Sequence, residues 1–406
     1  MSPHLSRPPY VAAAVLVASL GAPIIAQAQT LSLGQARAQA LASSPALVAA
    51  KAAVSAAEGR ARQAGFAPNP EASLESENLA GTGPMKGFDG AETTLSIGQR
   101  FELGGKRRTR ASAAAAEVEV ARLKLAVATA DLSSEVLVRY AQAQAAAERV
   151  VQARRAAERA KTLADVAATL VDAGREPPLR GLRAAAEADA AQARVVAAEA
   201  DLAASRRALA SLWGAGGEAA PDPAWLDLAA PGPIDPTASL DVRLAAAELE
   251  ASRAQVEHER AKAAPDVTVQ AGVRRFEETG DSALVVGVSA PIPIRDRNQG
   301  SIAAARSDAV AAEARQQAAL LASVRVIADG QAALAAATRR QAVLETRTVP
   351  QASQALDLAR QGFEAGKFGL LDVLDAQNAL SDAQNDLIEA RLARVQAQAA
   401  LERAAR

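Results

Sequence analysis

The sequence predicts a mainly α-helical protein with a small β part, built from a helix-hairpin repeat that occurs twice. Half of its 406 residues are hydrophobic, mostly alanine, and only 2% are aromatic. Alanine, leucine, arginine, glutamate and glutamine all favour helices. The run from Lys106 to Ala173 contains neither glycine nor proline, so as one helix it would extend about 100 Å. Such a helix exceeds what a globular domain needs and indicates an elongated bundle.

The second half of the chain repeats the first. Residues 43–74 resemble residues 238–269 in residue class, and LSIGQRFELGGKRR is matched by VGVSAPIPIRDRNQ. Internal repetition predicts one order of elements in each half: a helix, two strands, a very long helix, a tight break and another long helix. We therefore divide the chain into a signal peptide (1–28), a first repeat (29–212), an equatorial connecting segment (213–236) and a second repeat (237–406).

The N-terminus has the pattern of a signal peptide. A weakly basic start precedes an apolar stretch from Tyr10 to Ile25, and the small-residue site Ala26-Gln27-Ala28 follows. We expect cleavage after Ala28 and export from the cytoplasm. A lone membrane anchor is the alternative, although Gly21 and Pro23 interrupt the apolar run.

Four short segments alternate between apolar and polar residues and predict strands. Leu95, Ile97 and Phe101 fall on one face of the second segment, while Ser96 and Arg100 fall on the other. This alternation fits a membrane barrel and equally fits a half-buried soluble sheet. A membrane barrel needs at least about eight strands, so one chain cannot close it, whereas three chains would supply twelve. The predicted strands are residues about 70–79, 93–103, 266–276 and 283–293.

The helical hairpins are expected at about 105–212 and 300–406. Each long helix turns back at a glycine, Gly174 in the first hairpin and Gly366 in the second. Within the second hairpin we expect bends at Gly330 and Pro350. The connecting segment is expected to pack around the helices, because its tryptophans require burial.

Several short motifs resemble those of a known family. DVLDAQ follows a Gly-Lys turn, and APNPE, QRFELGGKR and IPIRDRNQG surround the strands. The chain resembles the TolC-like outer-membrane factors of Gram-negative tripartite efflux systems, and is most similar to the cobalt-zinc-cadmium resistance branch. This resemblance covers nearly all of the mature chain. One departure is the scarcity of aromatic residues for an interfacial girdle.

The resemblance implies a fold, a function and a set of partners. The fold is a homotrimer with a twelve-stranded barrel in the outer membrane, in contact with its lipid, above an α-helical periplasmic tunnel. The function is a passive export duct for heavy-metal cations. The partners are a periplasmic adaptor (membrane fusion) protein and an inner-membrane pump of the resistance-nodulation-division type.

Asp372 and Asp375 are the candidate pore constriction. They lie one helical turn apart after a glycine-rich break, and threefold symmetry would place six carboxylates around the pore. The resemblance implies an acidic ring here that favours cations. The plain alternative is a pair of helix-start acids stabilised by the helix dipole. The matching positions of the first repeat are Arg180 and Arg183, and their opposite charge predicts gate pairing across neighbouring hairpins.

Two further groups of residues are candidates for contacts outside the chain. The resemblance implies that the adaptor meets the hairpin tips. Basic residues also crowd a predicted helix start, where the helix dipole disfavours them. We expect these cations to face anionic lipid head groups or solvent. The tip residues are Gly174, Arg175, Gly366 and Lys367, and the basic residues are Lys106, Arg107, Arg108 and Arg110.

Composition argues against several other functions. A net charge of −1 predicts no nucleic-acid partner. The chain has no cysteine, two histidines and two methionines, so we expect no metal site, no cofactor and no enzymatic activity. Two alternatives remain: a secreted periplasmic coiled-coil scaffold without a channel, and a periplasmic hydrolase that uses the two aspartates.

Overall fold

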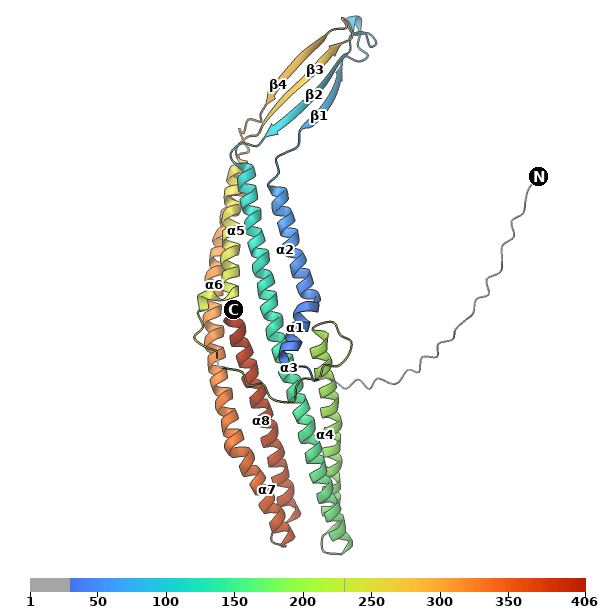
Figure 1. Ribbon diagram of the computed structural model, residues 1–406, viewed down its shortest axis with the longest axis vertical. Coiled ribbons are helices and arrows are strands. Elements are labelled where there is room, and N and C mark those ends of the chain that lie inside the picture. Colours follow the sequence, from blue (N-terminus) through green and yellow to red (C-terminus); the bar gives the residue numbers. More distant parts are fainter. Residues whose placement is uncertain (1–29, 230) are drawn as a thin grey trace, which may run out of the picture.

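The computed structural model describes residues 30–229 and 231–406. The molecule is long and narrow, with a small sheet at one end and helices along the rest of its length (Figure 1). The predicted signal peptide, residues 1–28, lies outside the described residues.

The predicted fold class is confirmed, with long helices and one four-stranded sheet. The boundaries that we assign to the repeats and the connecting segment stay predictions. In chain order the elements are α1 (Leu33–Ser43), α2 (Pro45–Ala64), β1 (Glu71–Glu77), β2 (Glu92–Phe101), α3 (Lys106–Asp172), α4 (Pro178–Ser211), α5 (Leu240–Lys262), β3 (Val267–Phe276), β4 (Ser282–Ser289), α6 (Gln299–Val343), α7 (Val349–Glu364) and α8 (Leu370–Ala404).

The first repeat opens with two helices where we expected one. Helices α1 and α2 meet at an angle of 47°. Pro45 is the first residue of α2, and proline at this position suits a helix start but cannot continue the preceding helix. The chain therefore changes direction at Ser44.

The sheet is antiparallel in the order β1-β2-β3-β4. Its central pair, β2 and β3, joins the two repeats. Leu74 of β1 pairs with Leu95 of β2, Leu95 with Val273 of β3, and Val273 with Leu284 of β4. Paired residues lie on the same face of a sheet, so an apolar row crosses all four strands.

Both hairpin tips lie at the end of the molecule farthest from the sheet (Figure 1). At each tip a glycine adopts a left-handed backbone, with φ of +68° at Gly174 and +71° at Gly366. Arg175 N–H donates to the Leu170 carbonyl at 2.9 Å, and Lys367 N–H donates to the Gly362 carbonyl at 2.7 Å. Both helices thus end in the same six-to-one hydrogen bond of a Schellman motif.

The two expected bends in the second hairpin differ in outcome. Helix α6 runs through Gly330 without a break, and the absence of a side chain leaves room for Leu401, whose Cδ2 would lie 2.8 Å from an added Cβ. A π-helical turn, Leu344–Thr348, precedes Pro350. Pro350 cannot donate the hydrogen bond that an α-helix requires, and the wider turn accommodates it.

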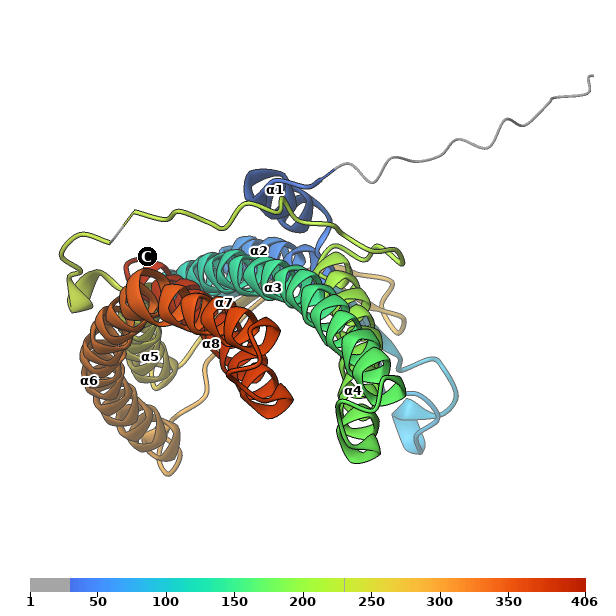
Figure 2. The same cartoon turned by 90° about the horizontal axis from the view of Figure 1, so that it is seen from below.

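The connecting segment is strapped across the helices. Gln144 Nε2 of α3 donates to the carbonyl of Asp222 at 2.8 Å, and Gln398 Nε2 of α8 donates to that of Ala229. Trp225 donates its indole N–H to Glu148 of α3. Seen along the long axis, the helices form a curved wall, and α1 and the connecting segment lie on its convex side (Figure 2).

Candidate functional site

One face of the sheet is apolar and exposed in the single chain. Side chains from all four strands share this face, and their exposed fractions lie between 52% and 75%. A contiguous apolar surface of this kind marks a contact with lipid or protein, and on alternating strands it is typical of a membrane barrel. The residues are Leu74, Leu95, Ile97, Val273, Leu284, Val286 and Val288.

The opposite face of the sheet is polar and internally bonded. Arg274 Nη1 lies 2.8 Å from Glu92 Oε2, and Arg274 Nη2 lies 3.1 Å from Glu77 Oε2. Ser73 and Ser96 share a hydrogen bond of 2.7 Å across β1 and β2. If the sheet closes into a barrel with its apolar face toward lipid, this polar face lines the interior.

A helical stretch within Gln299–Glu364 is also long and apolar enough, by composition, to cross a membrane. Its apolar character comes largely from alanine, and α6 packs along α5 and α8. The strands are therefore the better candidate for membrane contact, because their large aliphatic side chains are more than half exposed.

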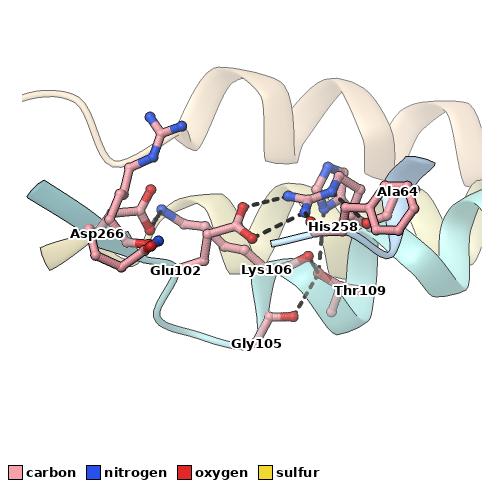
Figure 3. Close-up of polar contacts among 11 residues, drawn as sticks. Ala64, Glu102, Gly105, Lys106, Thr109, His258 and Asp266 are labelled. Atoms are coloured by element: carbon pink, nitrogen blue, oxygen red, sulfur yellow. Dashed lines mark hydrogen bonds and ion pairs between the residues drawn. The ribbon is translucent and has the colours of Figure 1, made fainter. Parts of the chain in front are cut away.

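Ion pairs fix the junction between the strands and the helices. Arg110 of α3 holds Glu102 with two hydrogen bonds of 2.5 and 3.1 Å, and also donates to the carbonyls of Ala64 and Phe66 at 2.9 Å. The hydrogen bond from Arg110 lowers the pKa of Glu102 below its ordinary value. Figure 3 shows this cluster beside the contact of Lys106 with Asp266, 2.6 Å from Nζ to Oδ1.

These contacts correct one expectation for the basic helix start. We expected Lys106 and Arg110 to face lipid head groups or solvent. Instead, both form ion pairs within the chain, Lys106 with Asp266 and Arg110 with Glu102. Only Arg107 and Arg108 of that group are exposed. A partner for Arg110 was signalled by Glu102, only eight residues away. Asp266 lies 160 residues from Lys106, and only the pairing of β2 with β3 brings them together.

At the opposite end, the two candidate constriction residues have different surroundings. Asp372 accepts the backbone N–H of Gly369 at 2.7 Å through Oδ2, which caps the start of α8. Asp375 is exposed, and within residues 30–229 and 231–406 its carboxylate makes no hydrogen bond or ion pair. Leu370 and Val373 are 1% exposed and pack this helix against its neighbours. The carboxylates are thus held on the outward side of a well-anchored helix start.

The arginines at the matching positions of the first repeat do not meet these aspartates within the chain. Arg180 Nη1 lies 2.6 Å from Glu176 Oε2, and Arg183 is exposed. In the part of the chain that the structure describes, no ion pair joins either arginine to Asp372 or Asp375. Pairing between neighbouring hairpins of different chains stays a prediction.

A groove of about 950 Å³ separates the two hairpin tips. Arg175 and Lys367, the two predicted adaptor contacts with side-chain charge, both line it. Burial, with a smaller contribution from Arg360, lowers the pKa of Arg159 at its floor. Cations outnumber acids among the charged residues of this lining, which are Arg159, Arg175, Arg180, Arg360 and Lys367 against Glu158, Glu176 and Glu364. The groove is an electropositive surface at the end of the molecule.

Comparisons with known proteins show the family of this chain. Residues 36–215 and 237–405 match the family model described as "Outer membrane efflux protein". The cobalt-zinc-cadmium resistance protein CzcC of Cupriavidus metallidurans is 32% identical over 334 residues, covering 80% of this chain and 78% of CzcC. The nickel and cobalt resistance protein CnrC of the same organism is 36% identical over 323 residues, covering 78% of this chain and 76% of CnrC. The crystal structure of the outer membrane protein VceC from Vibrio cholerae has a TM-score of 0.77 at 24% identity, covering 92% of this chain and 95% of that one.

Proposed function

This chain belongs to the outer membrane efflux protein family, and on that premise we propose that three copies form a passive export duct for heavy-metal cations. The chain is an outer-membrane channel component that extends into the periplasm. Membership of this family and the shared channel fold favour the channel over both the scaffold and the hydrolase alternatives.

The single observation that carries the proposal is the open sheet with an exposed apolar face. Strands β1 and β4 are its edges, and backbone groups at an open edge cannot stay unpaired inside a bilayer. Pairing β4 of one copy with β1 of the next closes twelve strands, satisfies both edges and turns every apolar face toward lipid.

The curved wall of helices completes the duct. Three such walls, related by the same threefold axis, would enclose a tunnel that continues the barrel into the periplasm. The hairpin tips would then surround the far opening, where Asp372 and Asp375 form the proposed constriction and Arg180 and Arg183 the proposed gate pairing.

The relatives suggest the cargo and the partners. CzcC is named for resistance to cobalt, zinc and cadmium, and CnrC for resistance to nickel and cobalt. We therefore infer that the cargo of this chain is divalent heavy-metal cations. A passive duct needs energy from elsewhere, which we assign to an inner-membrane pump of the resistance-nodulation-division type joined by a periplasmic adaptor.

The channel proposal is tested with the mature protein in membranes and in a planar bilayer. We expect extraction only with outer membranes, a crosslinked species of three chains, and discrete conductance steps. A monodisperse water-soluble monomer without conductance would contradict the proposal and restore the scaffold alternative.

The adaptor contact is tested by reversing charge at the tips. The electropositive groove suits an acidic partner surface, so Arg175→Glu with Lys367→Glu should reduce metal tolerance while leaving the amount of trimer unchanged. Lys51→Glu on the exposed side of α2, far from the tips, is the matched control and should have no effect. Adaptor crosslinks confined to the connecting segment would show that the contact lies elsewhere.

A further inference from the structure

A second groove lies where the sheet meets the helices. Its volume is about 1150 Å³, and it is lined by the ends of β2, β3 and β4 and by the loop before α6. Five cations line it against two carboxylates: Arg100, Lys106, Lys262, Arg295 and Arg297 against Asp266 and Asp296. The channel mechanism described so far assigns no role to this groove.

The strand register shows which side of the sheet the groove occupies. Arg100 pairs with Thr268, and Thr268 pairs with Ser289, and all three line the groove. These residues alternate with the exposed apolar side chains, so they lie on the polar face. In a closed barrel the groove would therefore open toward the channel interior and away from lipid.

Some of the cations are already neutralised within the chain. Lys106 is 2.6 Å from Asp266, and Lys262 is 2.7 Å from Glu259. Asp296 Oδ1 accepts the backbone N–H of Asn298 at 2.8 Å.

The remaining guanidinium groups have no acidic partner. Among residues 30–229 and 231–406, Arg100, Arg295 and Arg297 make no ion pair, and all three are exposed. Arg297 Nε donates only to the Pro293 carbonyl, at 3.2 Å. Against these three guanidinium groups the lining holds one carboxylate without an ion pair, that of Asp296, so an excess of positive charge remains at this groove.

Two helix N-termini add to the positive potential. Helix α3 begins at Lys106 and α6 at Gln299, and both starts lie at the sheet end of the helical wall (Figure 1). Cations beside a helix N-terminus raise its electrostatic free energy, whereas a bound anion lowers it. The groove therefore combines uncompensated guanidinium groups with two helix starts that favour negative charge.

We propose that this groove binds multivalent oxyanions of the phosphate class, so that three copies form a cationic ring at the base of the barrel. Guanidinium groups match phosphate oxygens in bidentate geometry, and rings of Arg or Lys select anions in pores. The ring rests on the proposed trimeric channel. A cation would then pass the acidic constriction at the tips first and this basic ring second, and an anion bound at the ring would lower the electrostatic barrier that the arginines present to it.

The test uses the purified trimer and inorganic pyrophosphate as the probe. Arg100→Gln with Arg295→Gln removes two uncompensated charges and retains Arg297, which bonds the loop. Calorimetry should show pyrophosphate binding to the wild type, weakened at least about tenfold in the double variant, because charge-assisted hydrogen bonds are lost. Pyrophosphate block of single-channel current should weaken in parallel.

The matched control is Arg107→Gln with Arg108→Gln. Both residues are exposed on the adjacent helix start but lie outside the groove lining, so this variant should bind pyrophosphate as the wild type does.

The outcomes separate this inference from the channel proposal. A conducting wild-type trimer that binds no pyrophosphate would overturn the inference alone. Equal weakening in both double variants would also overturn it, because the binding would then follow general surface charge. Absence of conductance in every variant would instead contradict the channel itself.

Discussion

At the scale of single residues, neighbouring acids with similar sequence context have different roles. One carboxylate oxygen of Asp372 accepts the Gly369 N–H. The carboxylate of Asp375 is exposed and makes no hydrogen bond or ion pair in the described chain. The helix-cap alternative thus applies to Asp372, and the charged constriction stays a prediction for both residues. Asp372 caps the helix start. Substitution of Asp375 is therefore the better test of ion preference, because it removes a charge without removing a helix cap.

We expect Asp375→Asn to reduce cation preference and block by multivalent cations in single-channel recordings, with stability unchanged. Asp372→Asn should cost about 1 kcal/mol of helix stability through the weakened cap, and should also reduce cation preference. Recordings and thermal unfolding of both single variants and the double variant check this. Unchanged ion preference and cation block in the double variant would mean that both are ordinary helix-start acids.

Glu259 links the end of α5 to the start of α6. This residue is 8% exposed, accepts from Lys262 Nζ at 2.7 Å and from Asn298 Nδ2 at 2.8 Å, and these hydrogen bonds lower its pKa below its ordinary value of 4.5. A lowered folded-state pKa contributes stability that is fully present above pH 4.5 and is lost as pH falls through the lower folded value.

The difference in melting temperature between the wild type and Glu259→Gln should therefore shrink on acidification. At pH 7 the variant loses charge-assisted hydrogen bonds and should be less stable by about 1–3 kcal/mol. Below pH 4.5 the wild type loses the same contribution and approaches the variant. Thermal unfolding of both proteins from pH 7 to pH 3 measures this difference. A gap that stays constant or widens at low pH would assign the effect to packing.

At the scale of elements, the two hairpins end alike although they contact different neighbours. Each pairs a left-handed glycine with a six-to-one hydrogen bond, and at both glycines the space around an added Cβ is open. The requirement for glycine is thus conformational and not steric. The two tips present Arg175 and Lys367 at corresponding positions of the same motif.

Gly174→Ala and Gly366→Ala should each destabilise their tip by about 1 kcal/mol, because alanine disfavours the left-handed region. Gly59→Ala in α2 is the matched control: its surroundings are equally open but its backbone is helical, so it should be neutral or stabilising. Limited proteolysis at the tips, compared across the three variants, checks this. Equal tip cleavage in all three would contradict the conformational explanation.

Features that depend on one-dimensional patterns could be predicted from the sequence. Glycine-free runs predicted the long helices, and alternation at Leu95 and Ile97 predicted an apolar strand face. Alternation alone could not show whether that face met lipid or a soluble core. The pair Lys106–Asp266 was out of reach because it depends on how the two repeats pair in the sheet, and the cap by Asp372 depends on a side-chain rotamer.

At the scale of the whole molecule, the two ends differ in chemistry. The sheet end presents aliphatic side chains outward and polar groups inward, and the helical end presents exposed charge at its tips. This difference between the two ends favours the sheet end, and not the helical end, for contact with a membrane. An isolated sheet in water would leave its apolar face exposed, and insertion into lipid in the proposed trimer would cover it.

Substitution of neighbouring residues in β4 tests this orientation. Val286→Arg places a charge on the lipid face, at a cost of up to about 2–4 kcal/mol near the bilayer midplane, and should sharply reduce outer-membrane trimer. Val285→Arg, one residue away and directed to the opposite face, is the matched control and should assemble. Trimer yield after membrane extraction measures both. Loss of assembly with Val285→Arg and not with Val286→Arg would reverse the assignment of the faces.

The strap formed by the connecting segment has a mechanical consequence. Its bonds to Gln144 of α3 and Gln398 of α8 lie at matching distances from the tips, since Gln144 is 28 residues before the end of α3 and Gln398 is 28 residues after the start of α8. About 42 Å of helix therefore extends from the strap to each tip. If a hairpin tilted by about 10° about the strap, its tip would move by about 7 Å, and in the proposed trimer a small rotation at the midpoint would then change the width of the far opening.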